Sequence, residues 1–185
     1  MEDILKEIEH YADKAHGNQM RKYSPERYIV HPVRVMKICR QYDDRLPVLA
    51  AALLHDVLED TAVNEKQIAS FLKMLLSDED VSETLLFVKE LTDVYVKENY
   101  PQWNRKKRKR HELERIKLTS PESQTIKYAD IIDNCREIAA NDPDFALLFL
   151  KECLAVLREA DKGNPELYKI AVETVEKELE NTYPD

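Results

Sequence analysis

The sequence predicts an all-α protein, a bundle of about nine helices, and three observations support this fold class. Apolar residues recur at the spacing of one helix face along most of the 185-residue chain. At three places a residue that can cap a helix is followed directly by proline, and this combination is typical of a helix start. No stretch of the chain has the convincing pattern of a β-strand.

In the first half of the chain, apolar stripes and start signals predict helices in five places. They run from Ile4 to Ala15, from His31 to Cys39, from Pro47 onward, after Asn64, and from Val81 to Leu91. The third helix is apolar on all sides over residues 48–54, so we expect it to be central and buried. Asn64 and Gln67 form the pattern of a capping box. Residues 17–28 should form an irregular loop, as should residues 93–101.

In the second half, the helix starts are marked by Ser120-Pro121, Asp142-Pro143 and Asn164-Pro165. Each is followed by an apolar stripe at helical spacing. The last stripe, within residues 166–180, could pack inside the domain or across a homodimer. The length is that of one domain spanning residues 1–185.

Composition excludes several classes of function. The net charge of −8 argues against general nucleic-acid binding. With two glycines in the whole chain, there is no Gly-rich phosphate loop, so a phosphate group must be held by side chains or a metal.

We expect a cytoplasmic protein with no membrane partner. The acidic start of the chain, residues 1–5, lacks the pattern of a signal peptide, and the apolar run 48–54 is too short to cross a bilayer. The three cysteines, Cys39, Cys135 and Cys153, form no CxxC pair, so we expect reduced and mostly buried thiols.

Four ionisable side chains interrupt the apolar run: His55, Asp56, Glu59 and Asp60. Burying such groups is costly unless they are paired or bind a metal. If one helix continues through them, residues four apart share a face, so His55 and Glu59 would lie side by side. An imidazole with an adjacent carboxylate can bind a metal ion, and a second pair of carboxylates can exchange protons with a metal-bound water.

Two further ligands are needed from elsewhere in the chain. His31 opens a helix directly after an apolar triplet, and Asp130 lies within an apolar helical stretch. With His55 and Asp56 they make a site of two imidazoles and two carboxylates. Such a mixed set suits Mn²⁺, Fe²⁺ or Zn²⁺.

The order of these residues resembles the HD-domain phosphohydrolases, and most closely the small alarmone hydrolases of the RelA/SpoT type. The matching motifs are Ala15-His16-Gly17-Asn18-Gln19-Met20-Arg21-Lys22, Tyr28-Ile29-Val30-His31-Pro32, residues 51–61, Leu91-Thr92-Asp93 and residues 126–130. The likeness covers a motif core of about residues 7–137, followed by a helical C-terminal extension over residues 143–181.

The resemblance implies a role for each matching residue. The implied metal ligands, for which the family generally uses Mn²⁺, are His31, His55, Asp56 and Asp130. Glu59 and Asp60 would position and deprotonate the attacking water. The residues implied to hold the nucleotide are Arg21, Lys22 and Asn134. The implied reaction removes the 3′-pyrophosphate of ppGpp or pppGpp to give GDP or GTP, as in a guanosine-3′,5′-bis(diphosphate) 3′-diphosphatase.

Some positions depart from the family pattern. Residues 23–27 replace a glycine-containing turn, and Tyr128 and residues 131–133 replace more usual choices. These changes do not affect the implied metal ligands, but the resemblance no longer determines which base the pocket would recognise. The alternatives are the same chemistry on NADPH or a deoxynucleotide, a non-catalytic nucleotide sensor, and a plain helical interaction protein.

A basic run, residues 105–110, stands out in this acidic chain. It could be a solvated helix face paired with Glu112 and Glu114. It could equally be a lid that brings Arg105 and Lys109, which share a helix face, to a polyphosphate. Both interpretations stay open at this point.

Overall fold

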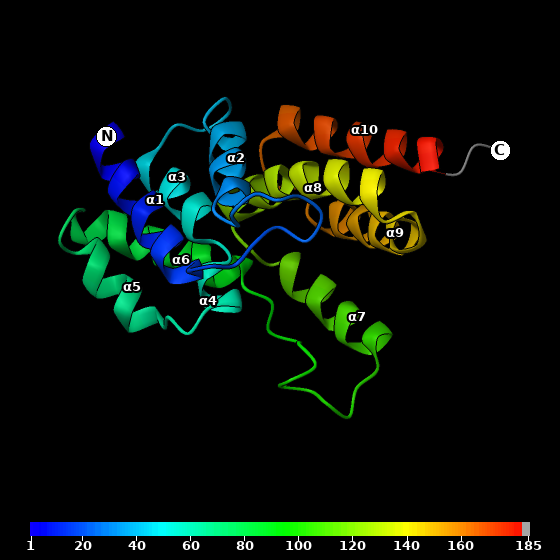
Figure 1. Ribbon diagram of the computed structural model, residues 1–185, viewed down its shortest axis with the longest axis horizontal. Coiled ribbons are helices and arrows are strands. Elements are labelled where there is room, and N and C mark those ends of the chain that lie inside the picture. Colours follow the sequence, from blue (N-terminus) through cyan, green and yellow to red (C-terminus); the bar gives the residue numbers. More distant parts are fainter. Residues whose placement is uncertain (183–185) are drawn as a thin grey trace. The chain divides into compact units, whose positions relative to one another are not determined.

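The computed structural model describes residues 1–182, and these residues contain ten α-helices (Figure 1). Nine have eight residues or more, and the tenth, α4, is a single turn of four residues. Over the same residues, extended backbone pairs only in an isolated bridge between Met20 and Arg27. The all-α prediction is therefore confirmed. The chain divides into two compact units, Met1–Thr92 and Asp93–Asp185, and the single-domain organisation stays a prediction.

Unit 1 is built around one buried helix. It contains α1 (Glu2–His16), α2 (Val30–Cys39), α3 (Leu46–Leu54), α4 (Val57–Asp60), α5 (Glu65–Leu72) and α6 (Asp78–Leu91). Helix α3 packs against α1, α2 and α6, and every residue from Pro47 to Leu54 is buried. Its all-round apolar sequence therefore has the central place that was predicted. The capping box of Asn64 and Gln67 is also present at the start of α5.

Unit 2 contains α7 (Arg105–Ile116), α8 (Pro121–Asn141), α9 (Pro143–Glu159) and α10 (Pro165–Thr182). Helices α8, α9 and α10 pack on one another, and α7 packs on α9. The three predicted caps are formed, because Ser120, Asp142 and Asn164 each accept a backbone N–H of the first helical turn. The apolar stripe of α10 is buried within this unit.

The turn between α9 and α10 is fixed by Tyr128, which is fully buried on α8. Its hydroxyl donates to the carbonyl of Ala160 at 2.6 Å and accepts the backbone N–H of Gly163 at 3.1 Å. Burial raises the pKa of Tyr128 to about 12. At Gly163 a side chain has no room, since a Cβ atom would lie 2.5 Å from the Tyr128 ring.

All three cysteines are free and buried, as the sequence predicted. Cys39 lies in unit 1, whereas Cys135 and Cys153 lie on α8 and α9 of unit 2. A hydrogen bond with Cys153, followed by burial, raises the pKa of Cys135. Separately, no helix within residues 1–182 combines the length and the apolar character that a membrane crossing requires.

Candidate metal centre and anion pocket

The predicted continuous helix through residues 55–60 is wrong. Helix α3 ends at Leu54, and α4 begins at Val57, so His55 and Asp56 lie in the turn between them. Asp56 has φ −93° and ψ −8°, at the edge of the helical region where many active-site residues lie. The break turns two neighbouring side chains towards one centre, which adjacent positions of a regular helix, about 100° apart, would not favour. Glu59 and Asp60 are exposed on α4.

His31, His55 and Asp56 converge within unit 1. Each offers one ligand atom, and these atoms all lie within 4.8 Å of one another. The Oδ2 atom of Asp56 lies 3.1 Å from Nε2 of His55 and 3.7 Å from Nε2 of His31. Both imidazoles are nearly inaccessible, at 1% and 4% exposure, while Asp56 keeps 20%. Three of the four predicted metal ligands are thus assembled around one point that solvent reaches from the Asp56 side.

The helix end explains how His55 is oriented. The last carbonyls of a helix have no backbone partner within it, and Ala52 lies in the last turn of α3. Nδ1 of His55 lies 2.8 Å from the Ala52 carbonyl oxygen, so Nδ1 carries the proton and donates it there. Nε2 then holds a lone pair that faces Asp56 and His31. This donor set fits a metal ion, since a ligating histidine typically donates its other ring nitrogen to a carbonyl.

Tyr28 holds the carboxylate of the same centre. Its hydroxyl donates a hydrogen bond of 2.7 Å to Oδ2 of Asp56. The sequence motif contained Tyr28, but nothing in the pattern assigned it this contact. The only available signal was its place three residues before His31 in an otherwise apolar segment.

The loop before α2 lies beside this centre. Residues 20 and 27 pair across it, and the Arg21 guanidinium lies 5.7 Å from the centre of the Tyr28 ring. The Lys22 ammonium lies over Tyr23. Within the same unit, Nδ1 of His16 hydrogen-bonds Gln19, whose amide donates to Asp60 at 3.5 Å. Gln19 therefore contacts one of the two predicted catalytic carboxylates, which the sequence did not reveal.

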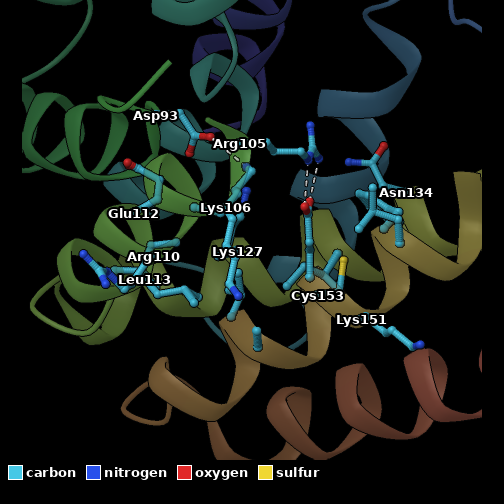
Figure 2. Close-up of a pocket in the computed structure, with 18 of the residues that line it drawn as sticks. Asp93, Arg105, Lys106, Arg110, Glu112, Leu113, Lys127, Asn134, Lys151 and Cys153 are labelled. Carbon is cyan, nitrogen blue, oxygen red and sulfur yellow. Dashed lines mark hydrogen bonds and ion pairs between the residues drawn. The ribbon is translucent and has the colours of Figure 1, made fainter. Parts of the chain in front are cut away.

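Unit 2 contains a pocket of about 950 Å³ between α7, α8 and α9 (Figure 2). This volume lies in the range of pockets that bind small molecules and cofactors. Four of the predicted site residues line it: Arg105, Lys109, Asp130 and Asn134. Seven of the lining side chains are cationic and four are acidic, in a chain whose net charge is −8. The apolar part of the wall comes from side chains such as Leu113, Leu148 and Phe149.

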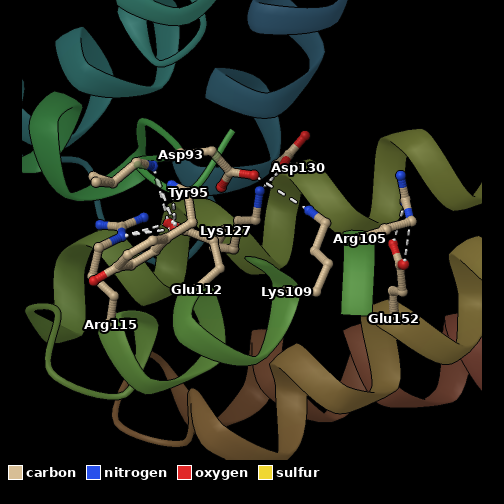
Figure 3. A network of polar contacts seen from close by, with 10 residues as sticks. Asp93, Tyr95, Arg105, Lys109, Glu112, Arg115, Lys127, Asp130 and Glu152 are labelled. Atoms are coloured by element: carbon tan, nitrogen blue, oxygen red, sulfur yellow. Dashed lines mark hydrogen bonds and ion pairs between the residues drawn. The ribbon is translucent and has the colours of Figure 1, made fainter. Parts of the chain in front are cut away.

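Asp130, the fourth predicted ligand, is held by its own helix in unit 2. Lys127 donates to Oδ2 at 2.8 Å (Figure 3), and Asn134 donates to Oδ1 at 2.6 Å. The carboxylate is 9% exposed, and these two contacts restrain its orientation. Asn134 also lines the pocket, and its amide contacts Asp130, while its predicted contact with substrate stays a prediction.

The basic run forms the first two turns of α7, and acidic residues of other segments hold two of its cations. Arg105 makes a two-pronged ion pair with Glu152 of α9, and Lys109 contacts Asp93 at 3.3 Å. Glu112, which one of the two interpretations placed on a solvated face, is 3% exposed. It accepts backbone hydrogens of the 94–95 segment and the Arg115 guanidinium. Because residues 94–95 lie outside any helix, their N–H groups donate to Glu112 instead, and Glu112 thus anchors this loop to α7.

Comparisons with known proteins found a matching family model and several related enzymes. A family model described as "HD domain" matches residues 28–135. A guanosine-3′,5′-bis(diphosphate) 3′-pyrophosphohydrolase of Spiroplasma citri is 26% identical over 97% of this chain, and the chain spans 22% of that protein's length. The MESH1 enzyme of the same name from Drosophila melanogaster is 33% identical, over 72% of this chain and 68% of its own.

A solved structure described as a metazoan ortholog of SpoT that hydrolyzes ppGpp superposes with a TM-score of 0.77. It covers 94% of each chain at 24% identity, which establishes the shared fold. The family match spans more than half of the sequence, and the matched residues include His31, His55, Asp56 and Asp130. The chain belongs to the HD-domain family.

Proposed function

We propose that this protein is a metal-dependent nucleotide pyrophosphohydrolase that removes the 3′-pyrophosphate of ppGpp or pppGpp to give GDP or GTP. The observation that carries the proposal is the convergence of His31, His55 and Asp56 on one centre. The names of the relatives from Spiroplasma citri and Drosophila melanogaster support the choice of substrate.

The metal site that we propose is formed by these three residues of unit 1, with Mn²⁺ as the ion, and Asp130 stays the fourth ligand predicted from the sequence. Imidazole and carboxylate ligands together suit Mn²⁺ among other divalent ions. When bound, a divalent ion supplies Lewis-acid catalysis, because it lowers the pKa of the attacking water and polarises a phosphoryl oxygen. The protein contributes the fixed tautomer of His55 and the Tyr28 hydrogen bond that orients Asp56.

Glu59 and Asp60 are proposed to position the attacking water and accept its proton. Both lie on α4, immediately after the turn that carries His55 and Asp56. Their exposure keeps the carboxylates open to water and substrate. Asp60 also accepts a long hydrogen bond of 3.5 Å from the Gln19 amide at the surface.

Arg105 and Lys109 are proposed to bind substrate anions in the pocket of unit 2, and Arg21 and Lys22 of unit 1 stay predicted substrate contacts. The pocket of unit 2 is large enough for a nucleotide portion, and its cationic lining suits phosphate groups. Asn134, whose amide already reaches Asp130, lines the same pocket and could also contact substrate.

The test is a turnover assay with purified protein loaded with Mn²⁺ and supplied with ppGpp, NADPH or deoxynucleotides. Chromatography should detect GDP and pyrophosphate from ppGpp and no comparable products from the others. No turnover of ppGpp would reject the substrate assignment, and turnover of NADPH alone would replace it.

A matched pair of variants separates the enzyme from a nucleotide sensor. Glu59→Gln should lower turnover by about 10²–10⁴-fold while Mn²⁺ binding persists, because the proton acceptor is lost but the ligands remain. Glu65→Gln is the control, since Glu65 pairs with Lys89 on the surface of unit 1. Equal activity of the two variants would remove Glu59 from the mechanism.

A further inference from the structure

An ion pair joins Arg105 of α7 to Glu152 of α9 (Figure 3). Nε of Arg105 donates to one carboxylate oxygen at 2.8 Å, and a terminal nitrogen donates to the other at 2.6 Å. Both residues line the pocket. A carboxylate thus occupies the donor fork of a cation that the proposed function assigns to a substrate phosphate.

The fork of an arginine binds carboxylate and phosphate with the same two-pronged geometry. One anion must therefore leave before the other can take the same two donors. Another anion can reach this ion pair, because the side chains of Arg105 and Glu152 are 49% and 23% exposed to solvent. A more highly charged anion is favoured in such an exchange because neighbouring cations, Lys106 and Lys109, line the same pocket.

We propose that Glu152 is a place-holder carboxylate, which occupies Arg105 when the pocket is empty and is displaced by a phosphate group of the bound ligand. The inference rests on the proposed function for the phosphate nature of that ligand. Glu152 thereby lowers the affinity of the pocket for phosphate anions. Because its partner is on α7, the same contact also ties this helix to α9 until the ligand arrives.

Inorganic pyrophosphate is the probe that tests this competition. Isothermal titration of the full chain with Mn²⁺ bound should show tighter pyrophosphate binding for Glu152→Gln than for the unmodified protein. The expected gain in pyrophosphate affinity is about three- to fivefold, because that factor corresponds to the energy of an exposed but well-aligned ion pair. Arg105→Ala should weaken pyrophosphate binding.

Two controls distinguish place-holding from a general change of charge. Glu159→Gln removes an acid of α9 that pairs with Lys117 at 3.0 Å, and neither residue lines the pocket. This variant should bind pyrophosphate like the unmodified protein. In the Arg105→Ala background, Glu152→Gln should bring no further gain, since the contact that it releases is already gone.

Unchanged or weaker pyrophosphate binding by Glu152→Gln overturns the proposal, even if thermal stability falls, because the pair is then purely structural. An equal gain in the Arg105→Ala background also overturns it, because the effect is then one of net charge. The ppGpp turnover of the unmodified protein is read separately. A protein that fails to cleave ppGpp but shows the Glu152→Gln gain loses the proposed function and keeps the place-holder.

Discussion

Replacing Tyr28 by phenylalanine should weaken divalent metal binding while leaving every proposed ligand in place. The change removes one hydroxyl, and with it the hydrogen bond of 2.7 Å to Oδ2 of Asp56. That oxygen is the atom which faces both imidazoles. Without the bond, the Asp56 carboxylate can rotate away from His31 and His55. The free energy of metal binding must then include the cost of ordering this carboxylate.

The size of the effect follows from the contact and its exposure. A hydrogen bond to a charged group is worth about 1.5–3 kcal/mol, and loss of such a supporting contact typically lowers metal affinity about 10–100-fold. Asp56 retains 20% exposure, so water can replace part of the lost bond. We therefore expect the lower end of the range, about a tenfold rise in the Mn²⁺ dissociation constant.

Competition titration with a Mn²⁺-sensitive dye would measure this constant. Tyr11→Phe is the matched control, because the Tyr11 ring stacks on Phe71 with a centroid distance of 4.0 Å instead of facing the centre. Its metal affinity should equal that of the unmodified protein. If Tyr28→Phe binds Mn²⁺ as tightly as the control, the hydroxyl does not orient a metal ligand and the reasoning fails.

Three predictions concern the stability of unit 2. Tyr128→Phe should lower the free energy of unfolding by about 1–3 kcal/mol in denaturant titrations, because the carbonyl of Ala160 and the N–H of Gly163 lose their partner. The pKa of Tyr128 is raised from 10.0 to about 12, so its stabilising contribution is complete below pH 10 and is lost as the pH rises towards 12. Tyr128→Phe should therefore lose less stability over that alkaline range, and equal slopes would contradict this. Gly163→Ala should cost about 1–3 kcal/mol, because a Cβ would overlap the Tyr128 ring, and an unchanged melting temperature would contradict the close approach. Glu112→Ala should cost about 2 kcal/mol, since it removes a buried carboxylate that accepts from Arg115 and from two N–H groups of the 94–95 segment, whereas Glu114→Ala at the surface should cost little.

Helix positions were predictable because their signals are local. The caps at Ser120, Asp142 and Asn164 depend on residues within one turn, and all three form as expected. The buried α3 was equally clear from its uninterrupted apolar sequence. By contrast, nothing in the sequence marked the end of α3 at Leu54, because neither glycine nor proline follows it.

The candidate site was predictable as a set of residues and much less as a geometry. The motif pointed to His31, His55 and Asp56, but the turn that lets the last two converge depends on packing. Contacts between distant positions were beyond local reasoning: Tyr28 meets Asp56 across 28 positions, and Arg105 meets Glu152 across 47. Charge alone could not distinguish that acid from other surface acids.

The buried cysteines give the protein an internal reporter for each unit. A thiol reagent should modify Cys39 only when unit 1 opens, and Cys135 only when unit 2 opens, since both are fully inaccessible. Mass spectrometry of peptides trapped over time would therefore follow both openings in one unlabelled sample. Equal trapping rates would mean that the units unfold together, and unequal rates would rank their local stabilities without any added probe.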